Sequence, residues 1–132
     1  MRTIIRRTGH SLLEVQHEVV HAYDWHIRSS TWSPPTDVYE TEQAVVVRVE
    51  IAGMREEDFE VALENNILVI AGSRPDFPER RAYHQMEIRF GKFVTAVGLS
   101  GPVDVDAARA EYADGFLTVT MPLQTPKAIR TE

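Results

Sequence analysis

Residues 107–121 have the sequence A-A-R-A-E-Y-A-D-G-F-L-T-V-T-M, which contains the clearest structural signal in the chain. Asp114-Gly115 is a dipeptide preferred in two-residue type I′ turns, because both central positions of that turn need a positive φ. The flanking segments, residues 107–112 and 116–121, carry the alternating apolar, β-branched and aromatic residues that are typical of strands. The stretch therefore predicts an antiparallel β-hairpin.

The same period of two recurs earlier in the chain. In residues 43–52, apolar residues alternate with other side chains, and residues 58–64 repeat this pattern. Asn65-Asn66 then separates residues 58–64 from an apolar run at 67–71, which predicts a second hairpin. A further strand is marked by Phe90, Phe93, Val94 and Val97. Short strands with regular turn signals and no helical crossovers favour an all-β fold, an immunoglobulin-like antiparallel sandwich.

Residues 1–34 have a different pattern and are predicted to form a short, partly helical N-terminal arm. Ser11 and Glu14 have the spacing of a capping box at the start of a helix. Apolar residues follow at steps of three and four, with apolar neighbours, at Leu12, Leu13, Val15, Val19, Val20 and Tyr23. Pro34-Pro35 ends any helix. We expect three parts: the arm (1–34), a sandwich domain (35–122) and a flexible C-terminal tail (123–132).

Composition excludes several classes of protein. The 132 residues suffice for one domain, and 14 Lys+Arg against 20 Asp+Glu give a net charge of −6. An acidic balance argues against a non-specific nucleic-acid binder, and no apolar run approaches the roughly 18 residues of a membrane span. The absence of cysteine excludes disulfides and fits a reducing compartment. We expect a cytoplasmic protein that binds neither nucleic acid nor membrane.

One short motif points to an enzyme. Residues 17–21 read H-E-V-V-H, the H-E-x-x-H pattern in which two helical histidines bind zinc and the glutamate activates water. The supports of that site are missing, because Asp24 and Ile27 stand where the extended motif has glycine and histidine. We favour an amphipathic arm whose polar face carries histidines. A zinc hydrolase and adventitious metal binding remain as alternatives, the latter involving His10, His17, His21 and His26.

Other catalytic signatures are missing from the sequence. It contains neither the G-x-S-x-G nucleophile elbow nor the G-x-x-x-x-G-K-[ST] phosphate loop. We predict that the protein is not an enzyme and has no catalytic residues, no metal and no cofactor.

Four segments resemble the α-crystallin domain of small heat-shock proteins of the bacterial type. They are distributed over the range from Pro35 to Pro122. Residues 35–53 are similar to the opening strands of that domain. Residues 66–72, N-I-L-V-I-A-G, resemble its N-x-L-x-I-x-G strand. Residues 83–93 resemble the segment after its dimerisation loop. Residues 110–122 are similar to its A-x-x-x-x-G-[VF]-L-x-[VI]-x-x-P signature. The four occur in the family's order and on strands predicted independently.

The resemblance implies an ATP-independent chaperone, a holdase that covers apolar surface of partly unfolded client proteins and prevents aggregation. Candidate client-binding residues lie on the arm: Leu12, Leu13, Val15, Val19, Tyr23, Trp25, Ile27 and Trp32. The alternative is that the arm packs on its own domain or on a partner's arm. A second candidate is the family's groove at the sandwich edge, lined here by Val61, Leu63, Ala108 and Ala110. Ordinary core packing explains those four residues equally well.

The connection from Ser73 to about Tyr83 is long for a compact domain. The resemblance implies that it carries a strand exchanged with a partner subunit, with a homodimer contact at Arg81, Tyr83, His84 and Met86. A plain surface loop is the alternative. An adaptor or co-chaperone built on the same sandwich is the second candidate function, but such relatives generally lack this loop.

The chain departs from the family pattern in its tail. The family carries an I-x-[IV] pair that docks into a neighbouring subunit, whereas here Ile129 is followed by Thr131. Losing one buried contact of isoleucine size removes roughly 1.5–3 kcal/mol from each docking event. Thr95 and Ser100 also stand where the family often has arginine and proline. We therefore predict a dimer or a small oligomer.

Overall fold

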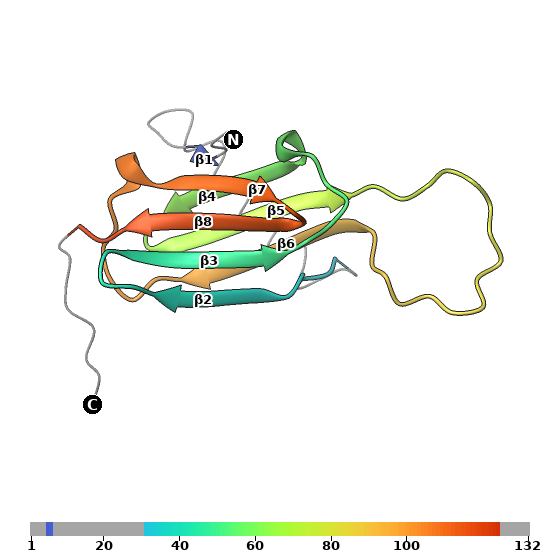
Figure 1. Cartoon of the computed structure of the whole chain (residues 1–132), viewed down its shortest axis with the longest axis horizontal. Coiled ribbons are helices and arrows are strands. Elements are labelled where there is room, and N and C mark those ends of the chain that lie inside the picture. Colours follow the sequence, from blue (N-terminus) through green and yellow to red (C-terminus); the bar gives the residue numbers. More distant parts are fainter. Residues whose placement is uncertain (1–4, 7–30, 125–132) are drawn as a thin grey trace.

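The computed structural model describes residues 5–6 and 31–124, which form two four-stranded sheets packed face to face (Figure 1). Sheet A has the order β1 (Ile5–Arg6), β4 (Phe59–Glu64), β5 (Ile67–Arg74) and β6 (Gly91–Gly98). Sheet B has the order β2 (Thr36–Glu40), β3 (Ala44–Glu50), β8 (Phe116–Pro122) and β7 (Arg109–Ala113). The strands pair antiparallel except β1, which runs parallel to β4. The prediction of an all-β sandwich is confirmed.

Both predicted hairpins are present. Asn65 and Asn66, between β4 and β5, have φ values of 55° and 62°, and Asp114 and Gly115, between β7 and β8, have 53° and 83°. Two consecutive residues with positive φ are the signature of the type I′ turn, whose twist matches that of paired strands. These local turns fix the strand register, which in turn decides which side chains face the core.

The core lies between the sheets and takes alternate residues from each strand. Its fully buried side chains include Phe59, Phe93, Ile51, Leu68, Ile70, Leu117 and Met121. Gly72 lies at the same level, on β5 opposite Phe93 of β6. A Cβ at Gly72 would stand 2.6 Å from the Asp58 carbonyl oxygen and 2.8 Å from the Phe93 ring. The glycine of the N-x-L-x-I-x-G pattern is therefore required by close packing.

Trp32 corrects one of our expectations. We assigned it to the exposed arm, but it is 8% exposed and belongs to the core. It forms a parallel bridge with Phe93, its ring lies 5.7 Å from the Phe93 ring, and its indole N–H donates to the Gly91 carbonyl oxygen at 3.3 Å. Burying a tryptophan with its N–H satisfied is favourable, so the chain adds to the edge of β6 before it reaches β2.

The rest of the arm and most of the tail lie outside the described residues. This applies to the predicted helix, the H-E-x-x-H motif, the remaining client-binding candidates and Ile129. In the described part, the two 3-10 helices, Glu56–Asp58 and Val105–Ala107, have three residues each. No helix there is long and apolar enough to cross a membrane.

Candidate interaction surfaces

A long loop projects from one end of the sandwich (Figure 1). It spans residues 75–90, because β5 continues to Arg74 and β6 begins at Gly91. Four large apolar side chains on it are exposed: Phe77 at 66%, Tyr83 at 46%, Met86 at 59% and Ile88 at 64%. Such a group on a projecting loop is typical of an interaction site. Sequence reasoning found Tyr83 and Met86 but missed Phe77 and Ile88, although both stand out as apolar residues in a polar, proline-containing segment.

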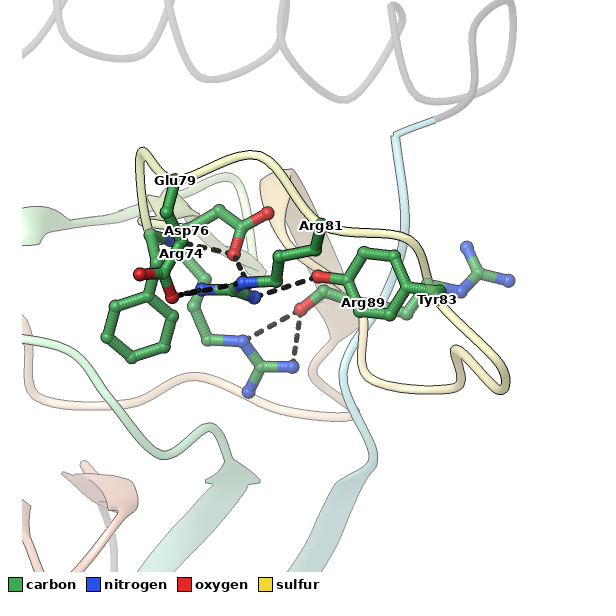
Figure 2. A network of polar contacts seen from close by, with 7 residues as sticks. Arg74, Asp76, Glu79, Arg81, Tyr83 and Arg89 are labelled. Carbon is green, nitrogen blue, oxygen red and sulfur yellow. Dashed lines mark hydrogen bonds and ion pairs between the residues drawn. The ribbon is translucent and has the colours of Figure 1, made fainter.

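Arg81 organises one half of this loop (Figure 2). Its guanidinium donates to Glu79 Oε1 at 3.0 and 3.2 Å and to the Tyr83 hydroxyl at 2.9 Å, and it lies 4.7 Å from the centroid of the Phe77 ring. The hydrogen bond to Tyr83 is the main cause that raises the pKa of Arg81 above its ordinary value. Exposed ion pairs add little stability, so the network mainly orients the aromatic side chains. His84 and Met86 lie outside it and are exposed.

Arg74 holds the base of the loop together. Its Nε donates to the Arg89 carbonyl oxygen at 2.8 Å (Figure 2), and Nη1 donates to the Ala52 carbonyl oxygen at 3.3 Å. The guanidinium also stacks over the rings of Trp32 and Phe90, with centroids 4.7 and 5.6 Å away. A planar cation suits this combination of aromatic faces and carbonyl oxygens. Arg74 therefore joins both ends of the loop to Trp32.

Strand β2 offers a second surface. It is an end strand of sheet B and pairs only with β3 within the described part of the chain. Val38 and Tyr39 on it are 49% and 46% exposed. An end strand with unpaired backbone groups is a template for another strand, so β2 is suited to receive an extended segment.

The four candidate groove residues occupy the core region. Val61, Leu63 and Ala110 are 0%, 4% and 0% exposed, and Ala108 is partly buried and packs against the core cluster to which they belong. In addition, β1 pairs with the edge of β4, with Ile5 opposite Val61 and Arg6 opposite Ala62. The structure thus places three of these side chains between the sheets, and the chain's own N-terminal strand covers part of the neighbouring backbone.

Residues 5–6 and 31–124 contain no group of three or more histidine, aspartate or glutamate side chains placed to hold a metal ion. Their most distinct surface features are an exposed apolar loop and an open strand edge. Both features are typical of β-sandwich surfaces that contact other proteins.

Comparison with known proteins places this domain in a family. The model of the Hsp20/alpha crystallin family matches residues 37–132. The chain belongs to the Hsp20/alpha crystallin family. It is 29% identical over 103 residues to small heat shock protein C4 of Rickettsia felis, covering 76% of this chain and 63% of that protein. It is 37% identical over 109 residues to the 19.0 kDa class II heat shock protein of Oryza sativa subsp. japonica, covering 75% of this chain and 62% of that protein.

Solved structures show the same relation. The chain is similar to heat shock protein 16.0 from Schizosaccharomyces pombe, with a TM-score of 0.69 at 29% identity, covering 76% of this chain and 94% of that one. Its sandwich therefore has the fold of a small heat-shock protein. The chain spans less than two thirds of the length of the Rickettsia and rice relatives.

Proposed function

We propose that this protein is an ATP-independent chaperone, a holdase that binds partly unfolded proteins and prevents their aggregation without catalysing a reaction. The observation that carries this proposal is the family match over residues 37–132 on a sandwich with exposed apolar surface. Covering the apolar surface of a client competes with client–client association and needs no bond making or breaking. We also propose that the protein acts in the cytoplasm, and the cysteine-free sequence supports this location.

The proposal is tested by light scattering of a heat-labile enzyme, with and without this protein, in the absence of ATP and with EDTA present. We expect suppression at near-stoichiometric ratios. An unrelated β-sandwich protein of similar mass serves as the control. Aggregation at the same rate with either protein would refute the holdase. Activity that depends on removal of EDTA would instead point to the zinc alternative.

Client contact by the arm is part of the proposal. The candidates are Leu12, Leu13, Val15, Val19, Tyr23, Trp25 and Ile27. Because Trp32 is a core residue, deleting residues 1–32 would also damage the sandwich. Trp25→Ser with Ile27→Ser is the better test, and it should weaken suppression while leaving the unfolding midpoint unchanged. Full protection by this variant would assign client contact to the sandwich or the loop.

We further propose a homodimer in which the loop of each subunit lies along β2 of the other. The support is the exposed apolar loop and the open β2 edge with Val38 and Tyr39 exposed. The proposed contact residues are Arg81, Tyr83, His84 and Met86, and we add Ile88 because it is exposed on the same loop. A strand added to a sheet edge gains main-chain hydrogen bonds from the edge and specificity from alternate side chains.

Sedimentation equilibrium of Met86→Asp with Ile88→Asp tests the dimer. We expect the double variant to be monomeric at concentrations at which the unmodified chain is dimeric. Arg80→Gln, on the same exposed loop, is the matched control and should remain dimeric. A double variant of unchanged mass would place the subunit contact elsewhere. A shell of many subunits formed by the unmodified chain would contradict the small assembly predicted from Ile129 and Thr131.

A further inference from the structure

The outer face of sheet A, which points away from sheet B, is apolar at its centre. In register across the strands, Ala62 of β4 lies opposite Val69 of β5, and Val69 lies opposite Ala96 of β6. In the adjacent row, Ala71 lies opposite Val94. Together with Ala96 at their margin, Ala62, Val69, Ala71 and Val94 form a cluster separate from the main core. We call these five residues the outer patch.

The outer patch is buried, although the described elements leave its face open. Ala62, Val69, Ala71 and Val94 are only 1–5% exposed. Sheet B packs on the opposite face, and the loop of residues 75–90 projects away from the sandwich (Figure 1). A side chain on an open sheet face keeps access to solvent from above, so this degree of burial requires a further layer of atoms. The uninterrupted apolar run Leu68–Ala71 is likewise typical of a strand covered on both faces.

The chain itself is attached at both edges of sheet A. Strand β1 lies along β4 at one edge, and Trp32 bridges to β6 at the other. With strands about 4.8 Å apart, the four steps from β1 to the Trp32 segment span roughly 19 Å. Residues 7–31 must connect these two edges. The helix predicted from Ser11 to Tyr23 has a length of about 18 Å at 1.5 Å per residue, which matches the width of the sheet.

We propose that the outer patch is the docking site for the apolar stripe of this chain's own arm, Leu12, Val15, Val19 and Tyr23. The inner face of sheet A is filled by the core, so a connection that crosses the sheet from one edge to the other has to cross its outer face. The small side chains of the patch suit a helix, because alanine lets a helix approach the sheet closely. An amphipathic helix of this length is marginal alone in water and gains its stability by such packing.

Disulfide trapping tests this docking, and the natural chain has no cysteine to interfere. Ala71→Cys is combined in turn with Val15→Cys, Val19→Cys and Tyr23→Cys, and each full-length variant is oxidised mildly. We expect at least one pair to form a disulfide within a single chain, seen as a non-reduced species of monomer mass. Disulfide-linked dimers alone would show that a second copy covers the patch and would overturn the proposal. So would the absence of cross-linking at all three positions.

Thiol labelling gives an independent measurement. The single variant Ala71→Cys should react with a maleimide about tenfold faster once Val15→Asp and Val19→Asp are added, because labelling reports opening of the covering layer. Thr118→Cys, on the outer face of sheet B, is the matched control, and its unchanged rate would show that the sandwich stays folded. Equal labelling of Ala71→Cys with and without the arm substitutions would refute the docking.

Docking of the arm would also affect chaperone activity. This consequence rests on the proposed function. Four of the arm residues assigned to clients, Leu12, Val15, Val19 and Tyr23, are then the same residues that cover the outer patch. A chain locked by the intramolecular disulfide should suppress aggregation less than the same chain after reduction. Cross-linking without any suppression by the reduced chain would refute the holdase and leave the docking intact.

Discussion

Gly72→Ala is the substitution whose effect follows most directly from the structure. The added methyl group would lie 2.6 Å from the Asp58 carbonyl oxygen and 2.8 Å from the Phe93 ring. Both distances are far inside van der Waals contact, and one neighbour is backbone that cannot rotate away. Phe93 is itself 1% exposed and is held against Trp32 and Phe59 at centroid distances of 5.7 and 6.2 Å. Neither neighbour can give way without moving the core.

The expected change in the free energy of unfolding follows from two opposing effects. Overpacking of a dense core costs about 1–3 kcal/mol, whereas replacing glycine by alanine stabilises by about 0.4–1 kcal/mol through the unfolded chain. We therefore expect the free energy of unfolding to fall by about 1–2 kcal/mol. For a domain of this size, that lowers the melting temperature by roughly 5–15 °C.

The assay is urea unfolding monitored by circular dichroism, at one protein concentration because association stabilises the folded state. Gly98→Ala is the matched control. Gly98 is also in sheet A, and a Cβ there would meet no atom within 4 Å. We expect this control to be as stable as the unmodified chain or slightly more stable. Equal midpoints for the two variants, or a more stable Gly72→Ala, would refute the packing explanation of this glycine.

Two further substitutions test single contacts. The Tyr112 hydroxyl donates to the Ile51 carbonyl oxygen at 2.8 Å and accepts from the Met54 N–H at 3.3 Å, so Tyr112→Phe should lower unfolding stability by about 1–2 kcal/mol. Tyr39→Phe, at an exposed position on β2, is its control, and an equal effect of both would contradict this assignment. Arg74→Lys should speed chymotryptic cleavage of the loop about tenfold, because lysine loses the planar stack and the paired donors. Arg80→Lys should not, and unchanged cleavage of the Arg74 variant would show that the loop is anchored elsewhere.

Most of the sandwich was predictable because its signals are local. Alternation in residues 43–52 and 58–64 and the turn dipeptides Asn65-Asn66 and Asp114-Gly115 are visible within a few residues. The predicted boundaries agree with β3, β4 and β8 to within two residues at each end. Strand β2 was not predicted from the residue pattern and was expected only from the family resemblance. Its three central side chains are all exposed, so no alternation marks it in the sequence.

Contacts between distant residues were not predictable from local pattern. Trp32 joins Gly91 and Phe93 across about sixty residues, and nothing in its sequence neighbourhood distinguishes a core tryptophan from an exposed one. For the same reason Val61 and Ala110 fit a groove or a core equally well, since alternation gives the face of a strand but not what covers it. The outer patch did leave a signal, the uninterrupted run Leu68–Ala71, which a strand with one solvated face does not need.

The edges of the two sheets differ in how far the chain itself covers them, and this difference favours the proposed association through sheet B. In sheet A, the chain itself covers part of both edges, with β1 on β4 and Trp32 on β6. In sheet B, β2 and β7 are end strands that pair with no further strand in the described residues. Unpaired edges invite strand addition, so the edges of sheet B are the sites open to it, and β2 carries exposed apolar side chains there. In the proposed dimer, association through β2 and the loop would be reciprocal between two copies and would close on itself, as a symmetric dimer requires.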